Sequence, residues 1–107
     1  MSTLPPYTAI EPTRSEVDAL PGATLLEFGT GWCAYCQATQ PVLADVMQTH
    51  ASTRHLRVED GKGRALGRSY RVTLWPTLIF LKDGVELARL IRPTNPQDIH
   101  EALSLLS

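Results

Sequence analysis

Short, dense runs of apolar residues mark the strands that the sequence predicts. The runs over residues 23–28 and 78–81 contain few polar residues, which is typical of strands covered on both faces. Residues 55–58 alternate between polar and apolar, which predicts a strand with one covered face. A tight turn after the second run leads into a strand over residues 85–91, so these two form a hairpin. A weaker stretch over residues 7–10 predicts a short edge strand.

Between these runs, apolar residues recur at the spacing of helices. Helices are expected over residues 13–20, 33–50 and 64–70, and from Thr94 or Asn95 onwards. Thr13 and Glu16 form a capping box at the start of the first helix, and Pro41 lies inside the second and should bend it. The resulting order, β-α-β-α-β-α-β-β-α, predicts an α/β fold. Its central mixed sheet has about five strands, and about four helices flank it on both faces.

Composition and charge narrow the class of protein. The chain has 107 residues, 43% of them apolar and 20% charged, which fits a single globular domain over residues 1–107. A net charge of −1 gives no reason to expect nucleic acid or a membrane surface as a partner. No apolar stretch approaches the roughly 20 residues that cross a bilayer. Residues 1–24 contain no basic region followed by an apolar run, so we expect no secretory signal and a cytoplasmic location.

The candidate chemistry lies in the two cysteines, Cys33 and Cys36. They follow a predicted buried strand and open a predicted helix, where free backbone N–H groups and the helix dipole stabilise a thiolate on Cys33. Cys36 lies one turn further on, in reach of Cys33, and should be more buried. In a reducing compartment such a pair is redox-active or binds a metal.

A zinc site is the less favoured of these two readings. Zinc needs four ligands, and the remaining candidates are His50, His55 and His100. They do not form a matching pair on one predicted element. We therefore expect no metal and no bound cofactor, and we expect His50 and His100 to be solvated helix residues.

The motif Trp32-Cys33-Ala34-Tyr35-Cys36 does not stand alone. It follows Leu26-Glu27-Phe28-Gly29-Thr30-Gly31 and precedes Pro41, the segment from Tyr70 through Trp75-Pro76 to Leu78, and Lys82-Asp83-Gly84. In order and spacing, over nearly the whole chain, these segments resemble the thioredoxin family. The resemblance implies a thioredoxin fold in which Cys33 attacks a substrate disulfide and Cys36 resolves the product. It also implies that Trp32 shields the cysteines and that Pro76 is cis and faces them.

The same resemblance implies partners for the chain. They are protein disulfide substrates and an NADPH-dependent thioredoxin reductase that recharges the cysteines, with the chain itself a monomer. Substrate contacts are expected from Trp32, Ala34, Tyr35, Trp75 and Pro76. The backbone N–H and C=O of Trp75 are expected to pair with an extended substrate strand.

The sequence also departs from the family pattern. Ala34-Tyr35 replaces Gly-Pro, Glu27 replaces a buried Asp, His55 replaces a Lys, Trp75 replaces a small aliphatic residue, and Arg92 replaces a Gly. These changes bear on substrate range and redox poise. Arg92 is expected to be a solvated charge or to edge the substrate groove.

Glu27 is unusual because it interrupts an apolar strand. A carboxylate in a covered strand needs a purpose, and by analogy with the family we assign it as the acceptor of the Cys36 proton. As a buried carboxylate it should destabilise the fold. For His55 we favour exposure on its strand over the alternative that it is a partner of Glu27.

Two other functions remain open at this stage. A glutaredoxin-like, glutathione-linked enzyme can also carry a Cys-x-Tyr-Cys motif. A binding module could use the fold only for docking, although docking alone does not require Cys33, Cys36, Trp32 and Pro76 together. Reduction of insulin disulfides with each reducing system would separate the three.

Overall fold

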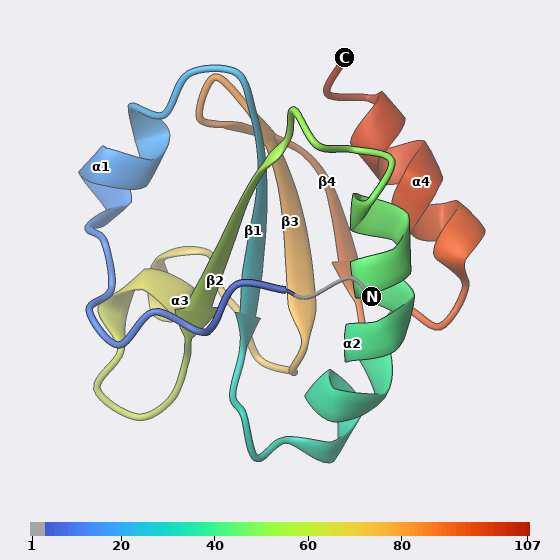
Figure 1. Ribbon diagram of the computed structural model, residues 1–107. Helices are drawn as coiled ribbons and strands as arrows, with labels where there is room; N and C mark the ends of the chain where they lie inside the picture. The colour runs from blue at the N-terminus through green and yellow to red at the C-terminus, as the bar shows by residue number, and fades with distance from the viewer. Residues whose placement is uncertain (1–3) are drawn as a thin grey trace.

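A four-stranded mixed sheet forms the centre of the computed structural model, which describes residues 4–107 (Figure 1). The strands are β1 (Ala23–Gly29), β2 (Arg54–Glu59), β3 (Thr77–Lys82) and β4 (Val85–Ile91), and the helices are α1 (Arg14–Asp18), α2 (Ala34–Met47), α3 (Ala65–Ser69) and α4 (Pro96–Ser104). The strand order is β2-β1-β3-β4. β1 pairs with β2 in parallel, and the other two pairs are antiparallel. Across residues 4–107, no helix is long and apolar enough to cross a membrane.

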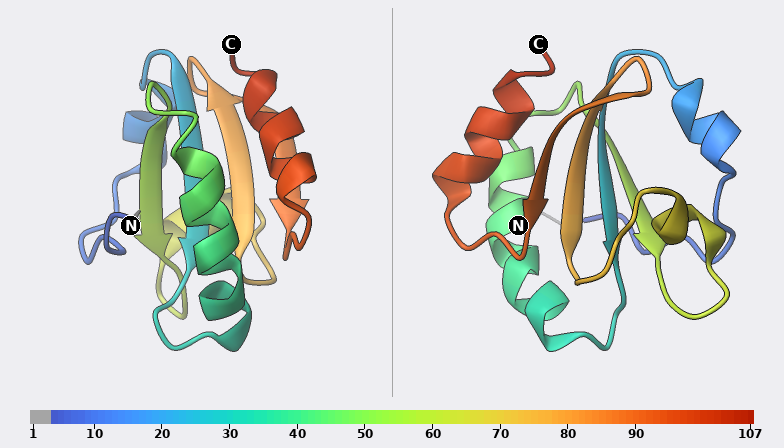
Figure 2. Two further views of the ribbon diagram at one scale, coloured as in Figure 1. Left: turned by 45° about the vertical axis from the view of Figure 1, so that its right-hand side comes forward. Right: turned by 180° about the vertical axis from the view of Figure 1, so that it is seen from behind.

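Helices cover both faces of the sheet, as predicted. Figure 2 shows α2 and α4 on one side and α1 and α3 on the other. Because side chains alternate along a strand, Leu25 of β1 packs towards α2 and α4, whereas Leu26 packs on the other face. Phe80 and Ile79 of β3 divide in the same way. All four side chains are fully buried, which explains why these strands read as continuous apolar runs.

The pairing register gathers four segments at one edge of the sheet. Phe28, near the end of β1, lies opposite Thr77 at the start of β3. Thr77 in turn lies opposite Ile91 at the end of β4. Gly29 lies opposite Glu59 at the end of β2. The start of α2, the segment before β3, the residue after β4 and the residue after β2 therefore meet at this edge.

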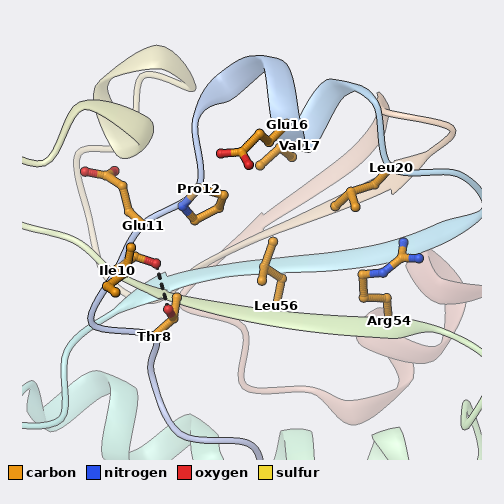
Figure 3. A pocket seen from close by; sticks show the side chains of 9 residues that line it. All are labelled: Thr8, Ile10, Glu11, Pro12, Glu16, Val17, Leu20, Arg54 and Leu56. Carbon is orange, nitrogen blue, oxygen red and sulfur yellow. Dashed lines mark hydrogen bonds between the residues drawn. The ribbon is translucent and has the colours of Figure 1, made fainter.

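The prediction of an edge strand over residues 7–10 is wrong. It is reduced to a single bridge between Thr8 and Val58, so the sheet has four strands and not five. The Thr8 hydroxyl donates to the Ile10 carbonyl at 2.8 Å, and this local bond turns the chain away from β2 (Figure 3).

The predicted helices are present, and most are slightly shorter than expected. The capping box at Thr13 and the cap at Asn95 are confirmed. α2 ends at Met47, because the N–H groups of Gln48, Thr49 and His50 bond to carbonyls three residues back and close the last turn tightly. Pro41 lies inside α2 as predicted and has no N–H for the helix ladder.

Candidate active site

Cys33 caps the amino end of α2. Its backbone is extended (φ −77°, ψ 122°), and its Sγ accepts a hydrogen bond from the Cys36 N–H at 3.2 Å. Both cysteines are free thiols, and both are buried, with 7% of Cys33 and 3% of Cys36 exposed. The N–H groups at the start of a helix favour negative charge, and Cys33 Sγ lies at that position.

The Cys36 thiol lies in a different environment. Burial, and then its hydrogen bond with Cys33, raise the pKa of Cys36 to about 11. The Thr30 backbone N–H acts against this rise by hydrogen bonding the thiolate. Cys36 therefore keeps its proton at neutral pH.

Behind Cys36 lies a group of paired polar side chains, which we call the buried cluster: Tyr7, Glu27, His55 and Arg57. Glu27 is only 2% exposed. Arg57 donates from Nε to Glu27 Oε1 at 2.9 Å and from Nη2 to Oε2 at 3.1 Å, in a two-pronged contact. His55 Nε2 lies 2.8 Å from the same Oε1.

The balance of forces on Glu27 favours its charged form. Burial raises the pKa of Glu27, but the hydrogen bonds from His55 and Arg57, together with the charge of Arg57, outweigh burial and lower it overall. The carboxylate is therefore ionised at neutral pH.

Tyr7 lies between Glu27 and Cys36. Its hydroxyl donates to Glu27 Oε2 at 3.2 Å, and its ring lies 4.1 Å from the Arg57 guanidinium carbon. Burial, and then the charge of Glu27, raise the pKa of Tyr7, so the hydroxyl stays protonated. Among the hydrogen bonds of residues 4–107, none joins Glu27 to Cys36 directly.

Gly29 makes room for this arrangement. A Cβ at position 29 would lie 2.7 Å from Cys36 Sγ and 2.8 Å from the Tyr7 hydroxyl oxygen, too close for either. Both groups therefore approach the same point above the end of β1. Any larger residue at position 29 would push Tyr7 and Cys36 away from β1.

The sequence analysis missed Tyr7 and Arg57, and its expectation for His55 was wrong. The His55 side chain is only 8% exposed and contacts Glu27. The signal was present in β2, where the alternation of His55, Leu56, Arg57 and Val58 puts both basic side chains on one face. Arg57 is also the direct cross-strand neighbour of Glu27. Nothing in the pattern indicated Tyr7, because the N-terminal segment reaches the site without forming a strand.

On the solvent side of the cysteines lies a second group, which we call the rim: Trp32, Tyr35, Trp75 and Arg92. The rings of Trp32 and Trp75 meet edge to face, with centroids 5.6 Å apart. Trp75 Nε1 donates to Asp60 Oδ2 at 2.8 Å, which fixes the indole. Trp32 is 73% exposed and Tyr35 is 56% exposed. An apolar surface of this kind beside a thiol is available to another molecule.

The remaining predicted contact residues lie nearby in the chain. Ala34 is exposed in the first turn of α2. The Trp75–Pro76 peptide bond is cis, as expected, and Pro76 is buried.

Arg92 is part of the rim and not a freely solvated charge. Its Nε donates to the Trp75 carbonyl at 2.8 Å, and its guanidinium carbon lies 3.8 Å from the centre of the Tyr35 ring. Its backbone N–H donates to the Pro76 carbonyl at 2.9 Å. These contacts hold the side chain across the segment that precedes β3.

The other two histidines lie beyond the carboxyl end of α2 and on α4. His50 Nε2 is 3.0 Å from His100 Nδ1, and both residues are half-buried, so the expectation that both are simply solvated was wrong. Burial, and then the charge of His100, lower the pKa of His50. Within the described range, residues 4–107, no three potential metal ligands come together.

A pocket of about 420 Å³ lies between α1 and the edge strand β2 (Figure 3). Its lining comes from the N-terminal segment, α1 and β2: Thr8, Ile10, Glu11, Pro12, Glu16, Val17, Leu20, Arg54 and Leu56. It contains neither cysteine and none of the predicted site residues.

Known proteins resemble the chain in sequence and in fold. The family model for thioredoxin matches residues 11–104. A solved structure of reduced thioredoxin 2 from Pseudomonas aeruginosa PAO1 is 51% identical, with a TM-score of 0.87 over 97% of this chain and 96% of that one. A thioredoxin of Aspergillus fumigatus is 23% identical over 80% of each chain. An H-type thioredoxin of Nicotiana tabacum is 28% identical, and the match covers 63% of this chain and 53% of that protein, about half its length.

Proposed function

This chain belongs to the thioredoxin family and is a thiol–disulfide oxidoreductase, and we propose that it reduces disulfide bonds in other proteins through Cys33 and Cys36. One observation carries the proposal. The Cys33 sulfur caps α2 and accepts a hydrogen bond from Cys36 N–H, so the two thiols lie within one helical turn, beside an exposed aromatic rim.

The proposed reaction has two exchanges. The Cys33 thiolate attacks one sulfur of the substrate disulfide, which breaks that bond, forms a mixed disulfide and releases the other substrate sulfur as a thiolate. Cys36 then loses its proton and attacks the Cys33 sulfur. The substrate leaves with two reduced sulfurs, and the chain is left with a Cys33–Cys36 disulfide. Two electrons pass from the chain to the substrate.

Glu27 is proposed to receive the proton of Cys36, with Tyr7 as the connecting hydroxyl. The contact between Tyr7 and Glu27 Oε2 and the approach of Tyr7 to Cys36 above Gly29 support this route. A carboxylate with a lowered pKa is ionised at neutral pH and can accept a proton, but it is a weak base. We therefore expect Glu27 to contribute about tenfold to the rate, less than a base tuned near neutrality.

Substrate is proposed to lie against Trp32, Ala34, Tyr35, Trp75 and Pro76. The exposure of Trp32 and Tyr35 supports this assignment, because a bound polypeptide would cover apolar surface there. The indole of Trp75 occupies space that a small aliphatic residue would leave open, so we expect a narrower groove that favours aromatic neighbours of the substrate cysteine.

The proposal extends to the partner and the compartment. Dithiol chemistry must be recharged, and we propose an NADPH-dependent thioredoxin reductase as the electron donor. We propose a cytoplasmic location, since a reducing compartment keeps such thiols ready to react. We also propose that the protein is a monomer.

Insulin reduction tests the proposed function. The purified chain should accelerate the precipitation of insulin when NADPH and a thioredoxin reductase are supplied, and Cys33→Ser should abolish that acceleration. Activity only with glutathione and glutathione reductase would instead favour a glutaredoxin-like enzyme. No activity with either system would favour a docking role.

A further inference from the structure

The guanidinium group of Arg92 is the one positive charge of the rim. We propose that Arg92 selects substrates that carry an aspartate or glutamate beside the disulfide. This inference rests on the proposed function, because it names the substrate class of that same site.

The position of Arg92 follows from the sheet. Ile91, the last residue of β4, lies opposite Thr77, so Arg92 emerges beside the segment that contains Trp75 and Pro76. Its backbone adopts the left-handed conformation (φ 51°), which turns the chain away from the sheet and towards α4. The side chain is then held by the Trp75 carbonyl and the Tyr35 ring. The charge is fixed in place before any substrate arrives.

Arg92 forms no ion pair among the residues that the structure describes. In contrast, Arg57 and Arg89 are each held by a glutamate. Only Nε of Arg92 donates a hydrogen bond to the described part of the chain, so its two terminal nitrogens are free to bind another group. A half-buried guanidinium with free donors matches a carboxylate in both charge and geometry.

The contact with the Trp75 carbonyl changes how a substrate can bind. That carbonyl was expected to pair with the backbone of an extended substrate strand. Here it already accepts a hydrogen bond from Arg92 at 2.8 Å, so an incoming strand meets a bound donor at this point. The carbonyl keeps a second acceptor position, so a substrate strand that pairs there also comes within reach of the Arg92 guanidinium.

There is also space for a substrate side chain beside Arg92. A pocket of about 140 Å³ lies between α2 and the turn after β4, and its walls include Tyr35, Thr39, Arg92 and Thr94. A negative group, Asp60, is bound at the indole of Trp75, whereas Arg92 is bound at the carbonyl of the same residue. An acidic substrate residue is attracted at Arg92 and repelled at Asp60, so the preference should hold on one side of the substrate cysteine.

Single-turnover reduction of matched peptides tests the inference. The prereduced chain is mixed with disulfide peptides that differ only in one residue beside the cysteine (Glu, Gln or Lys), on either side. Oxidation of the chain is followed by tryptophan fluorescence, which needs no recharging enzyme. On the favoured side, we expect the Glu peptide to react about threefold to tenfold faster than the Gln peptide, and the Lys peptide to be slowest. Raising the salt concentration should reduce these differences.

Variants assign the effect to Arg92. Arg92→Gln should remove the preference, and Arg92→Glu should invert it. Lys82→Gln is the matched control, because it removes one positive charge at the opposite end of β3 and should keep the preference. Equal rates for all wild-type peptides, or an unchanged preference in Arg92→Gln, would overturn the inference alone. If the wild-type chain reduced none of the peptides, the proposed function itself would fail.

Discussion

The buried cluster and the rim lie on opposite sides of the cysteine pair and differ in how far their polar groups are paired and exposed to solvent. In the buried cluster, both oxygens of Glu27 are occupied by Arg57, His55 and Tyr7, and Glu27 is only 2% exposed. In the rim, the aromatic rings are open to solvent and Arg92 keeps free donors. The contrast indicates that substitutions in the cluster change stability and proton handling, whereas substitutions in the rim change substrate choice.

The largest effect is expected from breaking the ion pair of the cluster. Arg57→Met leaves Glu27 buried without its main partner, which should lower the free energy of unfolding by about 3–5 kcal/mol. Urea denaturation measures this loss. Glu86→Gln is the control, because its partner Arg89 is at the surface and such pairs contribute about 1 kcal/mol or less. A small loss in Arg57→Met would show that the cluster is no more important to stability than a surface pair.

Acid should weaken the cluster. The folded-state pKa of Glu27 lies below its ordinary value of 4.5, so its contribution to stability is complete above that pH. That contribution is lost as the pH falls through the lowered folded value. Urea denaturation at several pH values should show wild type losing stability below pH 4.5, while the gap to Glu27→Gln narrows. A constant gap down to strongly acidic pH would mean that the charge of Glu27 is not stabilised by its neighbours.

Tyr7→Phe tests whether the cluster takes part in the reaction of Cys36. Loss of the hydroxyl removes one hydrogen bond to Glu27 and should cost about 1 kcal/mol of folding free energy. It should also slow release of the second substrate thiol by about threefold to tenfold, without slowing the first exchange. Rapid-mixing kinetics separates the two steps.

A second tyrosine provides the control for that experiment. Among residues 4–107 the buried Tyr70 hydroxyl has no hydrogen-bond partner, so Tyr70→Phe should leave both steps and the stability nearly unchanged. If Tyr7→Phe and Tyr70→Phe release the second thiol at the same rate, Tyr7 has no part in the resolving step.

In the rim, a substitution should change substrate range more than stability. Trp75→Ile removes the edge-to-face contact with Trp32 and the bond to Asp60, which should cost about 1 kcal/mol. The same change opens the groove and should broaden the range of peptide disulfides that the chain reduces. An unchanged range would indicate that Trp75 only packs against its neighbours.

The sequence predicted the fold and the cysteine pair because both depend on local patterns. These signals involve residues that are close together in the sequence. Examples are the apolar runs of β1 and β3 and the helix caps at Thr13 and Asn95. Only part of the cluster could be read in this way: the alternation along β2 places His55 and Arg57 on one face, but Tyr7 reaches Glu27 across the fold. We had expected a lone Glu27 carboxylate to destabilise the fold. Because Arg57 and His55 pair with it, we now expect its charge to be stabilised in the folded state.

The central claim is that Cys33 attacks and Cys36 resolves. The direct test mixes a disulfide peptide with Cys36→Ser and, separately, with Cys33→Ser, and measures each protein by mass spectrometry. The geometry predicts that Cys36→Ser accumulates a stable mixed disulfide through Cys33, because Cys33 caps α2 and no resolving thiol remains. Cys33→Ser should remain nearly unmodified, since burial keeps Cys36 protonated. Trapping of the peptide on Cys36 in Cys33→Ser, with none in Cys36→Ser, would contradict the account by reversing the two roles.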